Sequence, residues 1–445
     1  MIARLITSVL SLLFFALLVN GQTPQQLADT ELPSLLTIYK DLHTHPELST
    51  FEERSSAIVA KELKAAGCEV TERVGKYDQP GATGYGVVGV MKNGDGPVVL
   101  VRSDMDALPV HEDTGAPYAS TVTAKSREGR DVPVMHACGH DVHMSCLIGS
   151  ARILSKLKDR WHGTILFIGQ PAEETIVGAK AMMKDGLYTR WPKPNYALAL
   201  HDDGEIEAGK IGIVPGYCQA ASDSVDVTVK GAGGHGAWPH KTHDPIVLSA
   251  EIINAWQTII SREKNPLDPA VVTVGSIHGG TKHNIIPDEV KMQLTVRSFK
   301  PEVRQAILAA LDRIAKGCAV AAGIPSDRMP ELRPTESTAA TYNNPELAKR
   351  EAAAMKLALG NDNVFEKDPI TGSEDFCEYS LADHSIPALI FYVGAVAPQK
   401  IADSKKPGAS PLPSLHSSKF LPVAEPTIRT GVIGMTACVL DLLKK

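Results

Sequence analysis

Short apolar runs rich in β-branched residues recur along this chain, and they constrain its fold more than any other feature. A continuous apolar run is typical of a strand buried on both faces of a sheet. A helical repeat of apolar residues, Leu147, Ala151 and Leu154, falls between such runs. Strands that alternate with helices predict an α/β sandwich with a mostly parallel sheet. The predicted strands are residues 86–91, 97–102, 164–168, 196–200 and 388–393.

The middle of the chain has a different rhythm. Residues 224–229 alternate apolar and polar side chains, as a half-exposed strand does, and residues 271–277 and 290–296 are further strands. Asp244 followed by Pro245 predicts the start of a helix, with Asp as the N-cap and Pro in the first turn. The predicted apolar face of this helix consists of Val247, Ala250, Ile253, Trp256 and Ile260.

A second helix of this middle region opens at Pro301 and is followed by a short strand near Leu332. The order strand, helix, strand, strand, helix, strand is the split βαβ pattern. It predicts an inserted α+β, ferredoxin-like domain of residues 218–336 within a larger domain formed by residues 22–217 and 337–445. A chain of 445 residues is also longer than one hydrophobic core usually supports.

Residues 1–21 have the pattern of a secretory signal peptide. Arg4 precedes an apolar run at residues 5–19, and Gly21 offers a small side chain before the predicted cleavage point. A membrane anchor is the alternative, but the run is shorter than the roughly 20 residues that a spanning helix needs. We therefore expect an exported chain, periplasmic or secreted, that has no membrane attachment once the signal is removed.

Charge and cysteine content exclude two classes of protein. The formal net charge of −6 and the lack of a basic run argue against nucleic acid as a partner. The seven cysteines are odd in number and irregularly spaced, which is not typical of a disulfide framework. We expect most of them to be small buried apolar side chains.

Residues 135–143 carry the strongest chemical signal. Three imidazoles, one thiol and one carboxylate fall within these nine residues. Burying such groups together is costly unless a cation or a hydrogen-bond network compensates, and a metal ion is the usual reason to combine sulfur, nitrogen and oxygen ligands. One glycine separates Cys138 from His140, so the backbone can turn both side chains toward one point. A buried cysteine and a surface histidine would explain either residue alone.

Three more segments supply the remaining ligands. Glu173 and Glu174 follow a predicted strand, as His201 does, and α/β sheets bind ligands at the carboxyl ends of their strands. His416 lies far along the chain. Each segment also has a purely structural explanation. The glutamates are compatible with a helix N-terminus, His201 with a polar loop and His416 with a surface position. With the preceding Cys-Gly-His they provide donors for two close divalent ions, and Glu173 is the best candidate for a general base.

The chain resembles the M20 metallopeptidase family, in the amidohydrolase branch that includes hippurate, N-acyl-amino-acid and auxin-conjugate hydrolases. The resemblance rests on residues 102–109, 135–143, 170–174, 233–239, 284–288, 372–376 and 415–416. These segments span nearly the whole mature chain, and their order is specific. The resemblance implies a zinc-exopeptidase-like catalytic domain and gives the inserted domain the role of a lid or dimerisation domain.

The resemblance also implies a role for each site residue. His235 would reach the active site of a dimer partner and stabilise an oxyanion, although in isolation it suits a turn in a glycine-rich loop. Asn284 and Arg297 would bind a substrate carboxylate, and Arg297 equally suits a structural ion pair. Asp106 would orient a ligand or cap a helix, and Asp104 stands where other branches carry a ligand histidine. The implied metal ligands are Cys138, His140, Glu174, His201 and His416, with Glu173 as catalytic base.

We therefore predict a metal-dependent amidohydrolase that cleaves the amide bond of N-acyl amino acids or related small conjugates. The resemblance implies two divalent ions, zinc or manganese, with cobalt or nickel also compatible, and a homodimer. A dipeptidase or carboxypeptidase that uses the same site is the alternative enzyme. A non-catalytic metal-binding protein is disfavoured because binding alone does not require Glu173.

Overall fold

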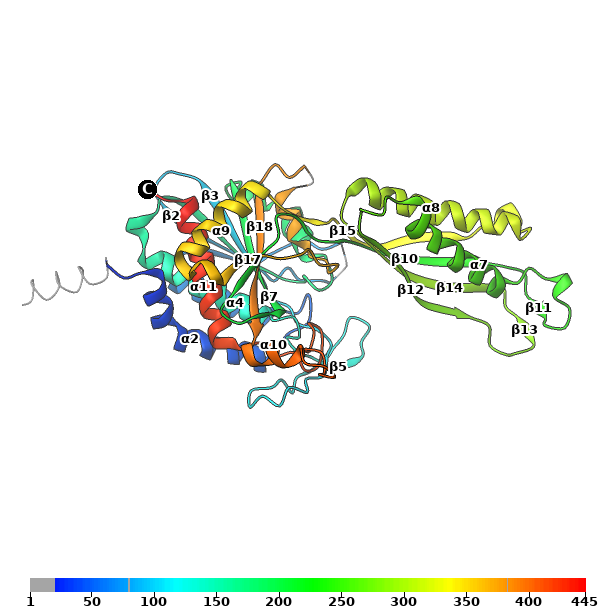
Figure 1. Ribbon diagram of the computed structural model, residues 1–445, viewed down its shortest axis with the longest axis horizontal. Helices are drawn as coiled ribbons and strands as arrows, with labels where there is room; N and C mark the ends of the chain where they lie inside the picture. The colour runs from blue at the N-terminus through cyan, green and yellow to red at the C-terminus, as the bar shows by residue number, and fades with distance from the viewer. Residues whose placement is uncertain (1–20, 79–80, 382) are drawn as a thin grey trace, which may run out of the picture. The chain divides into compact units, whose positions relative to one another are not determined.

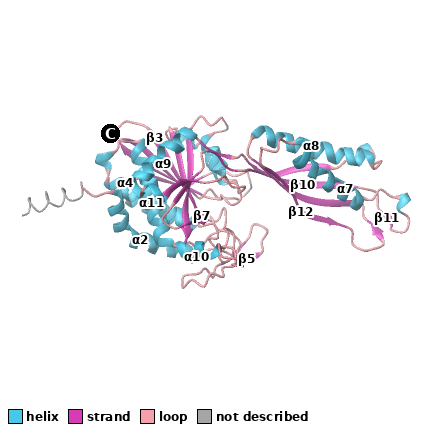
Figure 2. Cartoon of the chain, viewed as in Figure 1, coloured by secondary structure: helices cyan, strands magenta, loops and turns pink. Residues whose placement is uncertain are grey.

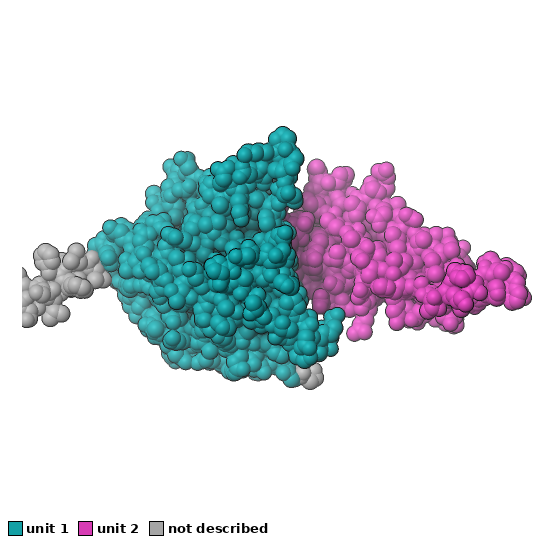
Figure 3. Space-filling view, turned by 90° about the horizontal axis from the view of Figure 1, so that it is seen from below, with its two compact units in different colours: residues 1–216, 342–368, 378–445 teal, residues 217–341, 369–377 magenta. Residues whose placement is uncertain are grey.

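The computed structural model describes residues 21–78, 81–381 and 383–445 (Figures 1 and 2). The predicted signal peptide, residues 1–21, therefore lies outside the described residues except for Gly21. Within the described ranges, no helix has the length and apolar character that crossing a bilayer requires. The chain divides into two compact units, one of residues up to 216, 342–368 and 378–445, and one of residues 217–341 and 369–377 (Figure 3).

The first unit is built on an eight-stranded sheet whose central strands are parallel. β3 runs parallel to β6 and to β7, and β7 runs parallel to β18. Antiparallel pairs lie toward the margins, where β1 meets β2, β2 meets β6 and β8 meets β18. The predicted α/β architecture is thus confirmed. In spatial order the strands are β1 (Glu69–Val74), β2 (Gly86–Asn93), β6 (Gly163–Gln170), β3 (Val98–Asp104), β7 (Tyr196–Glu207), β18 (Ala388–Val396), β8 (Ile211–Ile213) and β17 (Val364–Glu366).

Helices of the first unit share one large hydrophobic core with this sheet. α4 contacts both α2 and α11, and most of its side chains are buried. α2 starts with a capping box between Thr23 and Gln26, with Pro24 in its first turn. The long helices are α2 (Pro24–Thr44), α3 (Glu53–Ala65), α4 (His140–Lys156), α9 (Pro345–Leu359) and α11 (Ala424–Leu442). Shorter elements of the first unit are α5 (Gly178–Lys184), α6 (Leu187–Arg190), α10 (Pro398–Ser404), β4 (Thr123–Lys125) and β5 (Asp131–Pro133). The chain passes between the two units within β9 (Gly216–Gln219) and β16 (Thr341–Asn343).

The second unit has the predicted split βαβ order and its own core. Neighbouring strands of its four-stranded sheet are antiparallel throughout. Alternate side chains of β10 are buried, among them Val225, Val227 and Val229, and they pack with residues of both helices. The elements are, in sheet order, β12 (Ala270–Gly279), β14 (Glu289–Ser298), β10 (Ala221–Lys230) and β15 (Glu331–Thr338), with helices α7 (Pro245–Thr258) and α8 (Pro301–Ala321) and the ribbon β11 (Gly234–His235) and β13 (Ile285–Ile286).

Helix α7 begins where the sequence predicts, but its buried face is different. Asp244 Oδ1 accepts hydrogen bonds from the backbone N–H groups of the first turn, as an N-cap does. Leu248, Ile252 and Trp256 are buried, whereas the predicted face residues Val247 and Ala250 are exposed. Three successive apolar residues open this helix, so helical spacing alone cannot choose which of them faces the sheet.

The boundaries of the second unit also differ from the predicted range of 218–336. The unit extends to Thr341, and residues 369–377, which we assigned to the larger domain, belong to it. The backbone N–H of Ala220 donates to the carbonyl of Gly372 at 2.9 Å, and Gln219 forms a β-bridge with Ile370. A contact between segments this far apart in sequence leaves no local pattern, so a motif-by-motif prediction misses it.

Candidate metal centre

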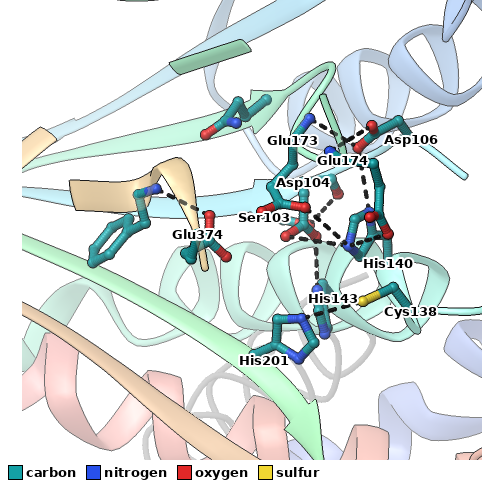
Figure 4. Close-up of polar contacts among 12 residues, drawn as sticks. Ser103, Asp104, Asp106, Cys138, His140, His143, Glu173, Glu174, His201 and Glu374 are labelled. Carbon is teal, nitrogen blue, oxygen red and sulfur yellow. Dashed lines mark hydrogen bonds and ion pairs between the residues drawn. The ribbon is translucent and has the colours of Figure 1, made fainter. Parts of the chain in front are cut away.

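The predicted ligands of the first unit converge at the carboxyl ends of its parallel strands. β3 ends at Asp104 and β6 ends at Gln170, just before the two glutamates, while His201 lies within β7 beside Tyr392 of β18. The opening of α4 brings in Cys138 and His140 at the same place (Figure 4). Parallel strands explain this convergence because their carboxyl ends share one edge of the sheet.

Gly139 shapes the turn between Cys138 and His140. Its φ of 72° lies in the left-handed region that favours glycine, and it is the N-cap position of α4. A Cβ at Gly139 would stand 2.2 Å from Asp202 Oδ2, so the buried Asp202 carboxylate occupies the space that any other residue would need. The glycine in this segment is therefore required both by backbone conformation and by packing.

The ligand atoms form overlapping groups that share Cys138. Its Sγ lies 3.6 Å from His201 Nε2 and 3.2 Å from His416 Nε2. Glu174 approaches from the other side, with Oε2 3.5 Å from His416 Nε2 and Oε1 3.8 Å from His140 Nε2. In the groups Cys138–His140–His201 and Cys138–Glu174–His416, all ligand atoms lie within 4.8 Å of one another. Cys138 is common to both groups, which suits two adjacent cations.

Unsatisfied buried atoms test whether a cation fits. Among the described residues, His140 Nε2 and Glu174 Oε1 have no hydrogen-bond partner although both side chains are buried. Burial and the neighbouring Asp106 and Asp104 raise the pKa of Glu174 to about 8, despite the opposing effect of His140. Burial and the surrounding carboxylates likewise raise the pKa of the Cys138 thiol well above its usual range. The raised pKa values mean that these buried groups ionise less readily than in water. A bound divalent cation would lower the pKa values and favour the ionised forms.

Asp106 holds the loop that carries Glu173 and Glu174, and it does not belong to the two ligand groups above. Its two carboxylate oxygens accept from the backbone N–H groups of Glu173, at 3.1 Å, and Glu174, at 3.0 Å. Ser49 Oγ donates to the same carboxylate at 2.6 Å, and His140 Nδ1 lies 3.3 Å from it. Asp106 therefore joins a ligand histidine to the loop that carries both glutamates, an arrangement that orients ligands.

His143 fixes the proton positions on the far side of the cluster. Its Nε2 accepts from the backbone N–H of Asp202 at 2.8 Å, so Nδ1 carries the proton and donates to Asp104 Oδ1 at 2.7 Å. Arg102 donates to the other oxygen of Asp104 at 2.7 Å. His201 Nδ1 donates to the Asp202 carbonyl at 2.6 Å, which leaves Nε2 as the lone-pair donor toward the cluster.

A buried histidine outside the predicted set supports the start of α4. His43 Nδ1 lies 2.6 Å from Asp141 Oδ2, and its Nε2 lies 3.1 Å from Glu112 Oε1. Both partners are acceptors, so both ring nitrogens must donate. Although burial opposes the charge, these hydrogen bonds raise the pKa of His43 to about 10. We did not single out His43 from the sequence, because nothing local connects it with residues about 100 positions away.

The other predicted residues belong to the second unit and are described within it. His235 and Asn284 lie together on the β11–β13 ribbon, where His235 pairs with Ile285 and the Asn284 carbonyl accepts from Gly236 N–H at 2.9 Å. Both are exposed. Arg297 is half-buried on β14 and donates to the hydroxyl of Ser373. The fold thus brings His235 and Asn284 together.

This arrangement, an α/β unit with a buried thiol, imidazole and carboxylate cluster that includes two adjacent glutamates, is typical of a metal-dependent hydrolase. Residues 100–413 match the model of peptidase family M20/M25/M40, and the chain belongs to this family. The resemblance to its amidohydrolase branch is confirmed, and with it the prediction of an enzyme that acts on amide bonds.

Several relatives match over most of their length. Thermostable carboxypeptidase 1 of Saccharolobus solfataricus is 35% identical, with 90% of this chain and 93% of the relative covered. An N-acetylcysteine deacetylase of Bacillus subtilis is 34% identical over 81% and 88%, and the hippurate hydrolase of Campylobacter jejuni is 36% identical over 76% and 83%. A solved dinuclear metal-binding M20 peptidase of Bacillus subtilis superposes with a TM-score of 0.73 at 27% identity, over 93% of this chain and 99% of the other.

The same relatives correct the predicted localisation. The N-acetylcysteine deacetylases and the hippurate hydrolase are enzymes of the cytoplasmic type. The expectation of an exported, periplasmic or secreted protein was therefore wrong. It rested on one apolar run at residues 5–19, which lies outside the described residues.

Proposed function

We propose that the protein hydrolyses the amide bond of N-acyl amino acids or related small conjugates, hippurate-like or N-acetyl-amino-acid-like. The observation that carries this proposal is the pair of adjacent glutamates beside the ligand cluster. Both glutamates lie in a group with His140, with Glu173 Oε2 3.9 Å from His140 Nε2, and Glu174 also groups with Cys138 and His416. We therefore assign metal ligation to Glu174 and proton transfer to Glu173. A site that only stored metal would not need a second glutamate there. The names of the deacetylase and hippurate hydrolase relatives support the substrate class.

The proposed ligands of two divalent ions are Cys138, His140, Glu174, His201 and His416. When bound, such ions polarise a carbonyl and lower the pKa of water. Thiolate with imidazole suits zinc, and carboxylates also accept manganese, cobalt or nickel. Glu173 acts as the general base that takes the proton of the attacking water and returns it to the leaving amine nitrogen. Asp106 holds Glu173 in place through the backbone N–H of that residue.

In the second unit we propose that Asn284 and Arg297 bind the substrate carboxylate and that His235 stabilises the oxyanion. Arg297 supports this role because its guanidinium is half-buried, and burial lowers its pKa even though the nearby Asp223 has the opposite effect. A guanidinium in such a place gains from a carboxylate ligand. His235 supports its role by its exposure beside Asn284 on one ribbon.

A homodimer follows from the proposed role of His235, and exposed apolar side chains of the second unit support it. Trp238 is 54% exposed and Val247 is 55% exposed, with Ile246, Ile277 and Ile285 also uncovered. Val247→Asp and Ile277→Asp should each shift sedimentation toward the monomer. Leu357→Asp, at a 91% exposed site on α9, is the control and should leave association unchanged. A wild-type protein that sediments as a monomer contradicts the dimer.

Glu173→Gln tests the reaction directly. The variant should keep two metal ions per chain while kcat falls by about 10³-fold, because the amide cannot take a proton. Glu366→Gln, at an exposed position on β17, should change neither quantity. Metal content by plasma mass spectrometry and turnover of N-acetyl and N-benzoyl amino acids are the measurements. Turnover close to wild type in Glu173→Gln would show that the base is another group.

A dipeptidase or carboxypeptidase is the second candidate, and the similarity to two thermostable carboxypeptidases favours keeping it. The two activities use the same chemistry and differ in what stands on the acyl side of the bond. Comparing kcat/KM for acetyl and benzoyl amino acids with that for matched dipeptides separates them. A clear preference for dipeptides would replace the N-acyl amino acid assignment.

A further inference from the structure

Ala172, immediately before the two glutamates, has a conformation that an alanine rarely adopts. Its φ is 52°, in the left-handed region, and its side chain is fully buried. Such a residue persists only where surrounding contacts hold it. On its carbonyl side, Ala172 accepts from the N–H groups of Val177 at 3.3 Å and Gly178 at 3.1 Å, which closes a tight loop.

On its N–H side, Ala172 donates to Glu52 Oε1 at 2.8 Å. Glu52 stands at the N-cap position of α3 but makes no side-chain cap there. The same Oε1 atom also accepts from the N–H of Thr50 at 2.7 Å, and Thr50 has a left-handed φ of 70°. One oxygen atom thus binds two unusual backbone positions that are more than 100 residues apart.

Glu52 is fully buried and lies near Asp106, whose carboxylate holds the loop of the two glutamates. Burial, with the nearby Asp106 carboxylate, raises the pKa of Glu52 to about 8. Asp106 accepts from the next two N–H groups, those of Glu173 and Glu174. Three successive N–H groups therefore end on two buried carboxyl groups, and the orientation of the first peptide sets the direction of the two side chains that follow.

We propose that Glu52 is a positioning residue for the Glu173–Glu174 pair. Its Oε1 holds Ala172 in the left-handed conformation, and this conformation directs Glu174 toward the ligand cluster and leaves Glu173 beside it. The inference rests on the proposed function for the role of Glu173, whereas the role of Glu174 is testable through metal affinity alone.

A double-mutant cycle with Ala172→Gly tests the inference, because glycine adopts a positive φ without the hydrogen bond. Glu52→Ala should weaken Zn²⁺ binding about 10-fold and lower kcat by about 10- to 100-fold, with a smaller change in KM. Glu52→Gln keeps an acceptor oxygen and should stay within about threefold of wild type. In the Ala172→Gly background, Glu52→Ala should cost clearly less than in wild type.

Glu47→Ala is the matched control. Glu47 also precedes α3, and its carboxylate accepts from the N–H groups of Arg54 at 2.9 Å and Ser55 at 2.7 Å, at the start of that helix. Its loss should lower thermal stability without altering Zn²⁺ affinity. Where Glu52→Ala does not fold, Glu52→Asp replaces it, because the shorter side chain withdraws the acceptor from Ala172.

The readouts are Zn²⁺ affinity by chelator competition and steady-state kinetics on N-acyl amino acids. Weakened Zn²⁺ binding that Ala172→Gly relieves supports the inference even if the substrate class proves wrong. Unchanged Zn²⁺ affinity in Glu52→Ala overturns it, and so does an equal loss in both Ala172 backgrounds, since Glu52 would then contribute only general stability. If Glu173→Gln keeps its turnover while Glu52→Ala still weakens Zn²⁺ binding, the proposed reaction is contradicted and the positioning role of Glu52 is not.

Discussion

Single residues at this centre are constrained by what lies against them, and Gly139 is the clearest case. Its left-handed φ of 72° would cost an alanine about 1 kcal/mol. The Asp202 carboxylate adds a steric conflict, because a Cβ would lie 2.2 Å from Oδ2. Asp202 directly follows His201, a proposed ligand, so we expect any shift of Asp202 to disturb metal binding as well. The backbone turn and the ligand geometry are therefore one feature.

We expect Gly139→Ala to lose most bound Zn²⁺ and to melt at a lower temperature than wild type. Gly129→Ala is the matched control, because Gly129 has a φ of 76° in an exposed turn with nothing within 4 Å of its Cβ position. The control should lose about 1 kcal/mol of stability and keep its metal. Metal content and thermal melts measure both. Full Zn²⁺ content in Gly139→Ala would mean that Asp202 can move at little cost.

At the scale of elements, α9 and α11 enclose a carboxyl group that no catalytic role requires. Glu351 of α9 is fully buried against α11, where Cys438 and Asp441 lie near it, and Arg350 Nε stands 3.8 Å from its Oε1. Burial, reinforced by Asp441, raises the pKa of Glu351 from its ordinary 4.5 to about 8. Folding therefore favours the protonated form of this side chain.

This shift makes the stability of the helix pair depend on pH. Below about pH 4.5 the group is protonated in both states and costs nothing, whereas between 4.5 and 8 only the unfolded state ionises, so stability falls as pH rises. We expect the advantage of Glu351→Gln over wild type to grow by about 1.4 kcal/mol for each pH unit between 5 and 8. Denaturant unfolding at several pH values measures it, with the exposed Glu346→Gln as control. A pH-independent difference would contradict the prediction.

At the scale of the whole molecule, each compact unit has a separate hydrophobic core, and only the first contains the ligand cluster. Removing cations leaves several buried carboxyl groups and a thiol close together without compensation. Binding of an ion to the folded state alone stabilises it by about 2.7 kcal/mol at 100 times Kd.

Chelation should therefore lower the melting temperature of the first unit, and Zn²⁺ should restore it. Because the second unit has its own core, a transition that belongs to it should not move with Zn²⁺ concentration. Differential scanning calorimetry of the full chain, in chelator and at increasing Zn²⁺, separates the two. If no transition shifts on chelation, metal bound at the cluster does not stabilise the folded first unit.

Much of the fold was predictable because its signals are local. Continuous apolar strands alternating with helices indicate a parallel α/β sheet, and the strand alternation of residues 224–229 indicates a half-exposed sheet. The buried face of α7 was not predictable, because Ile246, Val247 and Leu248 are all apolar and only packing selects among them. Residues 369–377 were missed for a related reason, since their partners lie far away in sequence.

The sequence by itself determined the kinds of candidate ligand and their placement after strands. Residue identity directly gives the thiol, imidazole and carboxylate groups, and strand ends can be recognised from local sequence patterns. Only the tertiary structure decided how these groups meet: that Cys138 is shared between two ligand groups, that His143 orients Asp104 and Asp202, and that Glu52 reaches Ala172. Hydrogen bonds and burial depend on chain segments brought together by the fold, and no local pattern encodes such distances.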